Sequence, residues 1–142
     1  MRMKIKNLIK KDMISVEKGS SGLSAIKIMH ENGISSLPIT EKNKVVGILT
    51  ERDVIKSIAN GSTMNRPVEE LGHMGKIVTI MDDDPISKAA EEMNIHNIRH
   101  LIVLSSKDKT PIGIVSVRDL ITDEQVILAL SSLSEENIRG SD

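Results

Sequence analysis

Short apolar runs and helical stripes of apolar residues alternate along the chain, and the same order of patterns occurs twice. The runs are rich in β-branched residues and are separated by polar turns, which is the pattern of strands and hairpins. They fall at 14–16, 37–40 and 45–49, and again at 78–80, 101–104 and 112–115. A helical pattern follows the first and the third run of each set. Each copy is therefore predicted to fold as strand, helix, strand, strand, helix.

Residue-by-residue matches indicate that the two copies arose by internal duplication. Ala25 and Met29 match Ala89 and Met93 at a spacing of 64 residues. The second turn is two residues longer, after which residues 47–55 match residues 113–121, with the same glycine, hydroxyl, arginine and aspartate positions. A nine-residue block of this kind does not recur by chance.

The first helix of each copy carries signals for its start and its end. In the second copy Asp84 is predicted as the N-cap, and Pro85 suits the first helical position because its missing N–H would have no intrahelical partner. An apolar stripe follows at 86, 89, 90 and 93. Gly33 and Asn97 stand at matching positions after the two helices, and both tolerate the left-handed conformation of a helix C-cap.

The predicted fold class is α/β (α+β), with two βαββα repeats related by a pseudo-twofold axis and packed sheet to sheet. A repeat of about 50 residues is too small to bury a sufficient core alone, so the two are expected to pack together. We place the first repeat at 8–62, the second at 68–123, and a C-terminal helix with a frayed tail at 124–142. The tail has apolar residues at helical spacing, namely Val126, Ile127, Leu130 and Leu133.

Composition narrows the possible functions. The chain has no Cys, which excludes a thiol nucleophile and thiolate metal sites, and no Phe, Tyr or Trp, which excludes RNA binding by aromatic stacking. A net charge of −1 argues against a general nucleic-acid binder. No apolar run approaches the roughly 18 residues of a membrane span. We therefore expect a cytoplasmic protein without membrane or nucleic-acid partners.

The repeated block places a hydroxyl and a carboxylate where a strand passes into a helix. These residues are Thr50 with Asp53, and Ser116 with Asp119. The hydroxyl can cap the helix near the positive end of its dipole, and the aspartate can accept two hydrogen bonds from a vicinal diol such as ribose. A plain N-cap with a first-turn carboxylate is the structural alternative. The recurrence of the hydroxyl and the aspartate in both copies favours a pair of equivalent binding sites.

This duplication, with the two blocks and the segment 98–103 (Ile-Arg-His-Leu-Ile-Val), resembles a tandem pair of cystathionine-β-synthase (CBS) domains, the Bateman module, over roughly residues 8–123. The resemblance implies clefts between the paired sheets that bind AMP, ADP, ATP or S-adenosylmethionine and thereby regulate an effector protein, which the sequence does not identify. It also implies a homodimer of two such pairs.

The resemblance implies that Asp53 holds the ribose hydroxyls in the first cleft, with Thr50 toward ribose or phosphate and Arg99 and His100 on the phosphate from the other repeat. The remaining first-cleft residues are Ser20, Ala25, the backbone at Ser35 and Ser36, and Ile48. The second cleft would use Asp84, Ala89, the backbone at Arg99 and His100, Ile114, Ser116 and Asp119. For Arg52 and Arg118, contact with phosphate, contact with a dimer partner and a solvated salt bridge all stay open.

Two departures from the family pattern distinguish the clefts. The first repeat has Ser35-Ser36 where the second has Arg99-His100, so only the first cleft gains the cationic pair. Asp84 replaces a hydroxyl where a phosphate would approach the second cleft. We therefore expect the first cleft to be occupied before the second.

No catalytic set is recognisable, so we expect a regulatory module rather than an enzyme. His96 and His100 need not share a face, and the acidic run 82–84 fits a helix start, so no metal site is expected. The alternative function is a structural or interaction protein that dimerises through its helices and whose clefts bind nothing.

Overall fold

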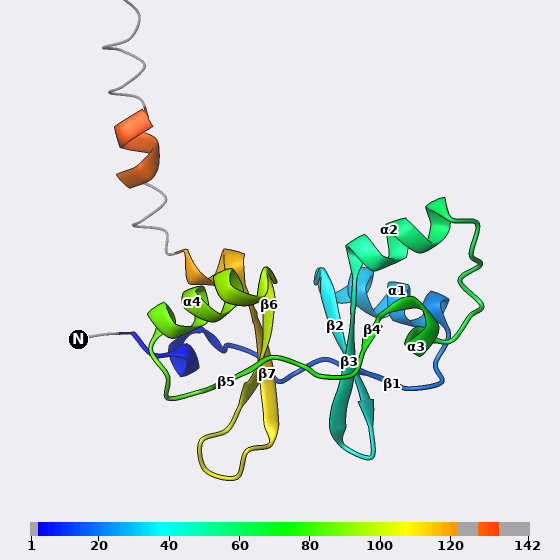
Figure 1. The fold of residues 1–142 in the computed structure, drawn as a ribbon, viewed down its shortest axis with the longest axis horizontal. Helices are drawn as coiled ribbons and strands as arrows, with labels where there is room; N and C mark the ends of the chain where they lie inside the picture. Colours follow the sequence, from blue (N-terminus) through cyan, green and yellow to red (C-terminus); the bar gives the residue numbers. More distant parts are fainter. Residues whose placement is uncertain (1–2, 122–127, 134–142) are drawn as a thin grey trace, which may run out of the picture.

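The computed structural model describes residues 3–121 and 128–133, and two α+β halves make up most of it (Figure 1). The first half contains one sheet of strand order β1-β2-β3-β4, in which β1 is parallel to β2 and the other pairs are antiparallel. Its elements are β1 (Val16–Glu17), α1 (Gly22–Asn32), β2 (Ser36–Glu41), β3 (Lys44–Thr50), α2 (Glu51–Ala59), α3 (Val68–Leu71) and β4 (His73–Met74).

The second half repeats this arrangement with a sheet of order β5-β6-β7. Its elements are β5 (Thr79–Met81), α4 (Ile86–His96), β6 (His100–Leu104), β7 (Pro111–Ser116) and the 3-10 helix η2 (Val117–Leu120). The hairpins have a register shift at the same place, after Ile39 and after Val103. The predicted duplication and βαββα order are confirmed, although the helix expected near Val117 is a single 3-10 turn within the described residues.

Each half has its own hydrophobic core between a sheet and its helices. In the first, Leu37, Ile39 and Leu49 pack with Ala25 and Met29. In the second, the corresponding residues are Leu101, Val103, Val115, Ala89 and Met93. Gly33 and Asn97 end α1 and α4 with φ values of 61° and 52°. The predicted left-handed caps are therefore confirmed.

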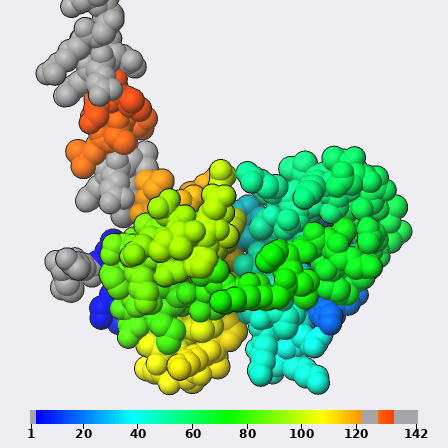
Figure 2. Space-filling view, viewed as in Figure 1, coloured from blue at the N-terminus to red at the C-terminus, as the bar shows by residue number. Residues whose placement is uncertain are grey.

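The two sheets pack face to face. Pro38 and Ile102 occupy matching strand positions on the sheet faces that point away from the helices, yet both are fully buried. In Figure 1 these faces lie opposite each other, and in Figure 2 the surface is notched between the two halves above and below the green segment that crosses between them. The fully buried pair therefore forms part of an interface between the repeats.

The N-terminal segment (residues 3–9) packs on the second repeat, although it precedes the first. Ile5, in the 3-10 helix η1 (Ile5–Leu8), is fully buried in the second core. The backbone N–H groups of Ile5 and Lys6 donate to the carbonyls of Asp84 and Asp82 at 2.9 and 2.8 Å. In the first repeat a middle segment (residues 64–74) has the same role, with Val68 and Leu71 buried. Thus one crossing segment completes each core.

These crossings explain the glycine of the repeated block. A Cβ atom on Gly113 would lie 2.7 Å from Cδ1 of Ile9 in the N-terminal segment, and one on Gly47 would lie 2.7 Å from the His73 carbonyl in the middle segment. Both distances are shorter than van der Waals contact. The glycine therefore permits the crossing segment to lie against the last strand of each repeat.

No helix among the described residues is both long and apolar enough to cross a bilayer. Of the tail stripe, Leu130 and Leu133 lie in a short helix over residues 128–133 and are 59% and 55% exposed. Val126 and Ile127 lie outside the described residues.

Candidate ligand-binding site

Strand register places eight side chains on the facing surfaces of the two sheets. Residues directly opposite each other in an antiparallel pair point to the same face. The pairs on the inner face are Ser36 with Thr50 and Pro38 with Ile48 in the first repeat, and His100 with Ser116 and Ile102 with Ile114 in the second. Six of the predicted site residues therefore share this inner surface, namely Ser36, Ile48, Thr50, His100, Ile114 and Ser116.

The repeated hydroxyl and aspartate form a capping box in both repeats. Thr50 Oγ1 accepts from the Asp53 N–H at 3.2 Å, and Asp53 Oδ2 accepts from the N–H and the hydroxyl of Thr50, both at 2.9 Å. Ser116 and Asp119 form the same box at 2.8 to 3.4 Å. In both repeats the hydroxyl is therefore a helix N-cap and the aspartate a first-turn carboxylate, as the structural alternative predicted. Among the described residues Oδ1 of each aspartate receives no hydrogen bond, so one oxygen stays available as an acceptor.

A backbone hydrogen bond fixes the start of each central strand beside this box. The Glu51 N–H donates to the Ser35 carbonyl, and the Val117 N–H donates to the Arg99 carbonyl, both at 2.9 Å. The predicted backbone positions of each repeat therefore lie next to its hydroxyl and aspartate. These two carbonyls already accept a hydrogen bond.

His100 lies where the strand-to-helix turns of the two repeats come together. Burial lowers the pKa of this histidine below its usual value, while Asp119 raises it, Arg99 lowers it further and Glu51 raises it. Because Glu51 belongs to the first repeat and Asp119 to the second, carboxylates of both repeats affect the pKa of His100. Glu51 was not among the predicted site residues, because the matching position of the second block is Val117.

Lowering the pH from about 7 to about 5 is expected to reduce the stability of the fold through His100. Its pKa is below 6.5 in the native state, so the unfolded chain binds more protons in this range. The contribution of His100 is therefore present above pH 6.5 and is lost as the pH falls toward the native pKa.

Urea unfolding followed by far-UV circular dichroism between pH 5 and 7.5 measures this effect. His100→Gln should flatten the pH dependence. His96→Gln is the matched control, because His96 is exposed and pairs with Glu92 at 3.2 Å on the surface of α4. Equal pH slopes in wild type and His100→Gln would contradict the assignment.

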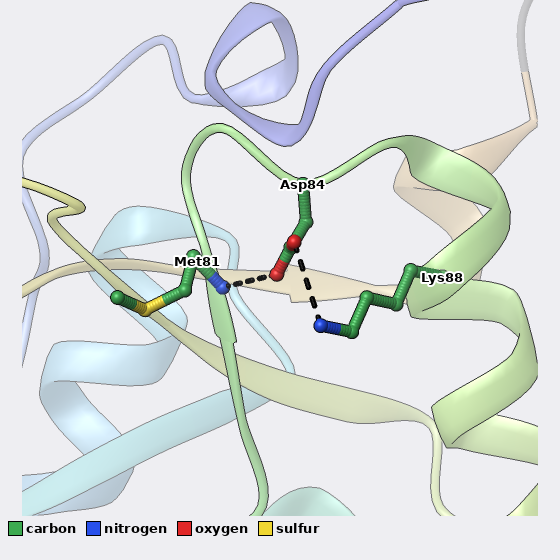
Figure 3. A network of polar contacts seen from close by, with 3 residues as sticks. All are labelled: Met81, Asp84 and Lys88. Carbon is green, nitrogen blue, oxygen red and sulfur yellow. Dashed lines mark hydrogen bonds and ion pairs between the residues drawn. The ribbon is translucent and has the colours of Figure 1, made fainter.

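Asp84 is not the helix N-cap that the sequence predicted. Helix α4 begins at Ile86, and the preceding Pro85 is extended, with φ −73° and ψ 153°. The Ile86 N–H donates to the Met3 carbonyl of the N-terminal segment at 3.3 Å, so the capping partner comes from outside the repeat. Asp84 Oδ2 instead accepts from the Met81 N–H at 2.9 Å, and Oδ1 lies 3.5 Å from Lys88 Nζ (Figure 3). Its carboxylate therefore joins the end of β5 to the first turn of α4.

The other predicted site residues differ in accessibility. Ala25 and Ala89 are fully buried in the two cores, where they pack α1 and α4 onto the sheets, and they present no surface to a ligand. Ser20 is half-buried and directly precedes Ser21, the N-cap of α1. The three arginines Arg52, Arg99 and Arg118 are exposed. Within residues 3–121 and 128–133 no His, Cys, Asp and Glu cluster has the arrangement of a metal site.

Comparison with known proteins identifies the same repeat. The family model described as CBS domain matches residues 5–60 and 64–124. A CBS domain protein from Pyrobaculum aerophilum complexed with AMP superposes with a TM-score of 0.78 at 25% identity, over 92% of this chain and 99% of that one. A CBS domain pair in complex with 5'-methylthioadenosine and S-adenosyl-L-methionine gives a TM-score of 0.75 at 27% identity, over 84% and 94% of the two chains.

Some curated relatives are much longer proteins. A homoserine O-acetyltransferase from Methanohalobium evestigatum is 36% identical over 118 residues, which are 82% of this chain. The chain spans 23% of the length of that enzyme. The shared part is therefore a small portion of this relative.

Proposed function

Because the chain belongs to the CBS-domain family, we propose that it is a non-catalytic regulatory module that binds an adenosine nucleotide or a related adenosine compound between its sheets and signals to a partner protein. The observation that supports this most is the pair of capping boxes, each of which leaves one aspartate oxygen available at the edge of the inner surface. An acceptor of this kind suits the two hydroxyls of ribose. The solved relatives with AMP or with S-adenosyl-L-methionine support an adenosine compound.

We place the preferred ligand at Asp53. Asp53 lies in the first turn of α2, and the dipole of this helix favours an anion at its N-terminus. The second repeat contributes His100, whose pKa the Glu51 carboxylate raises, and the neighbouring exposed Arg99. Ile48 and Ile114 offer apolar surface for a base on the inner faces. A ligand with adenine, ribose and one phosphate group, such as AMP, matches this set.

The proposal is tested on the purified protein. Since the chain has no Trp, Tyr or Phe, an adenine absorbance band can come only from bound ligand or contaminating nucleic acid, and mass spectrometry of the released material distinguishes the two. Calorimetric titration of stripped protein with AMP, ATP and S-adenosylmethionine then ranks the ligands. Absence of binding by all three would refute the proposal.

Arg99→Ala is expected to weaken AMP binding about tenfold and to leave adenosine binding unchanged. The guanidinium can pair only with the phosphate, and a hydrogen bond to a charged group contributes roughly 1.5–3 kcal/mol, while 1.4 kcal/mol corresponds to a factor of ten. Titration of both ligands measures the difference. Arg99→Lys keeps the charge but lacks the planar guanidinium, so its AMP affinity should lie between those of wild type and Arg99→Ala. Equal losses for AMP and adenosine would place Arg99 away from the phosphate.

We also propose that the protein is a homodimer. Ile55 and Ile58 on α2 are 66% and 55% exposed, although α2 is strongly amphipathic and its Val54 packs against the core. A hollow of about 210 Å³ between α1 and α2 is lined by Ile26, Met29, Ile34 and Val54, together with His30 and Glu51. Exposed apolar side chains on an amphipathic helix are a feature of protein interfaces.

Light scattering at tens of micromolar, an order-of-magnitude working concentration, should give the mass of a dimer. The double variant Ile55→Asp with Ile58→Asp should give a monomer. Met3→Asp charges an exposed apolar residue of the N-terminal segment and should remain dimeric. A monomeric wild type would refute the dimer. A dimer that binds no adenosine compound would instead support the alternative of an interaction protein.

A further inference from the structure

Another hollow lies between the tips of the two hairpins, away from Asp53 and Asp119. It has a volume of about 340 Å³ and is lined by residues of both repeats and of the segment that joins them, among them Lys44, Val45, Ile77, Leu104, Lys109 and Pro111. In Figure 2 it corresponds to the notch between the cyan and yellow hairpins, below the green segment. Its size is within the usual range of small-molecule sites, about 300–1,000 Å³.

This hollow and the candidate adenosine site are at opposite ends of the strands. Strand β3 runs from Lys44 at the hollow to Thr50 at the capping box. At about 3.3 Å per residue its ends are about 20 Å apart. Strand β7 likewise runs from Pro111 to Ser116. A ligand in the hollow would therefore be a different one from the ligand at Asp53.

The lining has an apolar floor and a cationic rim. Four partly exposed apolar side chains form the floor, namely Val45, Ile77, Leu104 and Pro111. Ile102, which also borders the hollow, is fully buried. Lys44 and Lys109 stand on the two hairpins, and neither forms an ion pair with any residue that the structure describes. No carboxylate belongs to the lining.

The surroundings strengthen the positive charge of the rim. Lys42, Lys76 and Lys107 are exposed neighbours of the lining residues. Three carboxylates are near. Glu41 is paired with Lys18 at 3.1 Å, Asp82 accepts from the Ser106 N–H at 2.9 Å, and Asp108 accepts from the N–H and hydroxyl of Thr110 at 3.1 and 2.7 Å. The five lysines of the rim and its surroundings outnumber them. The field at the mouth therefore favours an anion.

We propose that this hollow binds a free amphipathic monoanion, a medium-chain carboxylate, with its alkyl chain on the apolar floor and its carboxylate between Lys44 and Lys109. The floor removes alkyl surface from water, and the two ammonium groups pair with one anionic head. The lining contains no acidic acceptor for a ribose diol, which separates this ligand class from nucleotides.

Octanoate is the probe, with octanol as its neutral counterpart. Titration of the isotope-labelled full chain, followed by amide NMR shifts, should locate octanoate at Val45, Ile77 and Leu104. Octanol should bind at the same place at least about fivefold more weakly, because it lacks the charge. Shifts confined to α1 and α2, or equal affinity for octanol, would overturn the proposal.

A pair of matched double variants tests the rim. Lys44→Gln with Lys109→Gln should weaken octanoate binding at least about fivefold and leave octanol binding unchanged. Lys42→Gln with Lys107→Gln removes the same charge from the same hairpins outside the lining and should have a much smaller effect. Equal losses in the two double variants would show a general charge effect and would refute the site. AMP affinity should not change in either variant.

Discussion

Asp53→Ala is expected to weaken AMP binding at least about tenfold while lowering the free energy of unfolding by only about 1 kcal/mol. In the proposed site the free Asp53 Oδ1 accepts hydrogen bonds from the two ribose hydroxyls. Each charge-assisted hydrogen bond contributes roughly 1.5–3 kcal/mol in a shielded site. The loss of stability comes from the capping box, in which Oδ2 accepts from the N–H and hydroxyl of Thr50.

Asp119→Ala is the matched control for this experiment. Asp119 has the same two hydrogen bonds from Ser116, at 2.8 and 3.1 Å, so its removal should cost a similar amount of stability. Its effect on AMP affinity should be smaller, because Ser35-Ser36 stands where the other repeat has Arg99-His100. Calorimetric titration and melting temperatures of both variants give the two readouts. If AMP affinity in Asp53→Ala equals that of wild type, the ligand is elsewhere.

Ile5→Ala is expected to destabilise the protein by about 2–5 kcal/mol. Ile5 is fully buried in the second core, so shortening its side chain leaves a cavity there. Its backbone N–H still donates to the Asp84 carbonyl, which holds the residue in place. Far-UV circular dichroism in urea measures the change, since the chain has no aromatic residue for fluorescence.

Met3→Ala controls for a change in the same segment. Met3 is 43% exposed, and its contribution to the core is small. Its loss should change the free energy of unfolding by less than about 0.5 kcal/mol. Similar small losses in the two variants would mean that the N-terminal segment does not hold the second repeat together.

Local signals were sufficient for most of the fold. The capping boxes at Thr50 and Ser116, the left-handed residues Gly33 and Asn97, and the hairpins all depend on residues close in sequence. For these features a pattern of residue types specifies the structure directly. The duplication then placed two similar units in one chain and predicted that their sheets would face each other.

Features that depend on distant parts of the chain could not be predicted in this way. Nothing in Ile5 or Leu8 shows which repeat the N-terminal segment packs on, because two apolar residues in a short segment could complete either core. The error at Asp84 has the same origin, because the carbonyl of Met3 takes the helix amide that an aspartate cap would have taken. Pocket residues Ala25 and Ala89, carried over from the family, are in the cores instead.

The candidate site was predicted in part. The hydroxyl and the aspartate were predicted because they recur in both repeats, and His100 was predicted from the family resemblance. Their contact with a ligand stays a prediction. The sequence did not identify Glu51, whose charge reaches His100 only because the two repeats face each other. A further signal was present in the strands, where the period-2 pattern puts Pro38 and Ile102 on the inner faces.

The crossing of the N-terminal segment has a consequence for synthesis. Residues emerge from the ribosome in order, so Ile5 and Leu8 appear well before β6 and β7, which form the core that receives them. Contacts so distant in sequence raise the contact order and slow folding. The first repeat, whose middle segment follows it directly, can complete its own core early. The N-terminal residues must wait with their apolar side chains exposed, and a nascent chain stalled before β7 would be the form most exposed to aggregation.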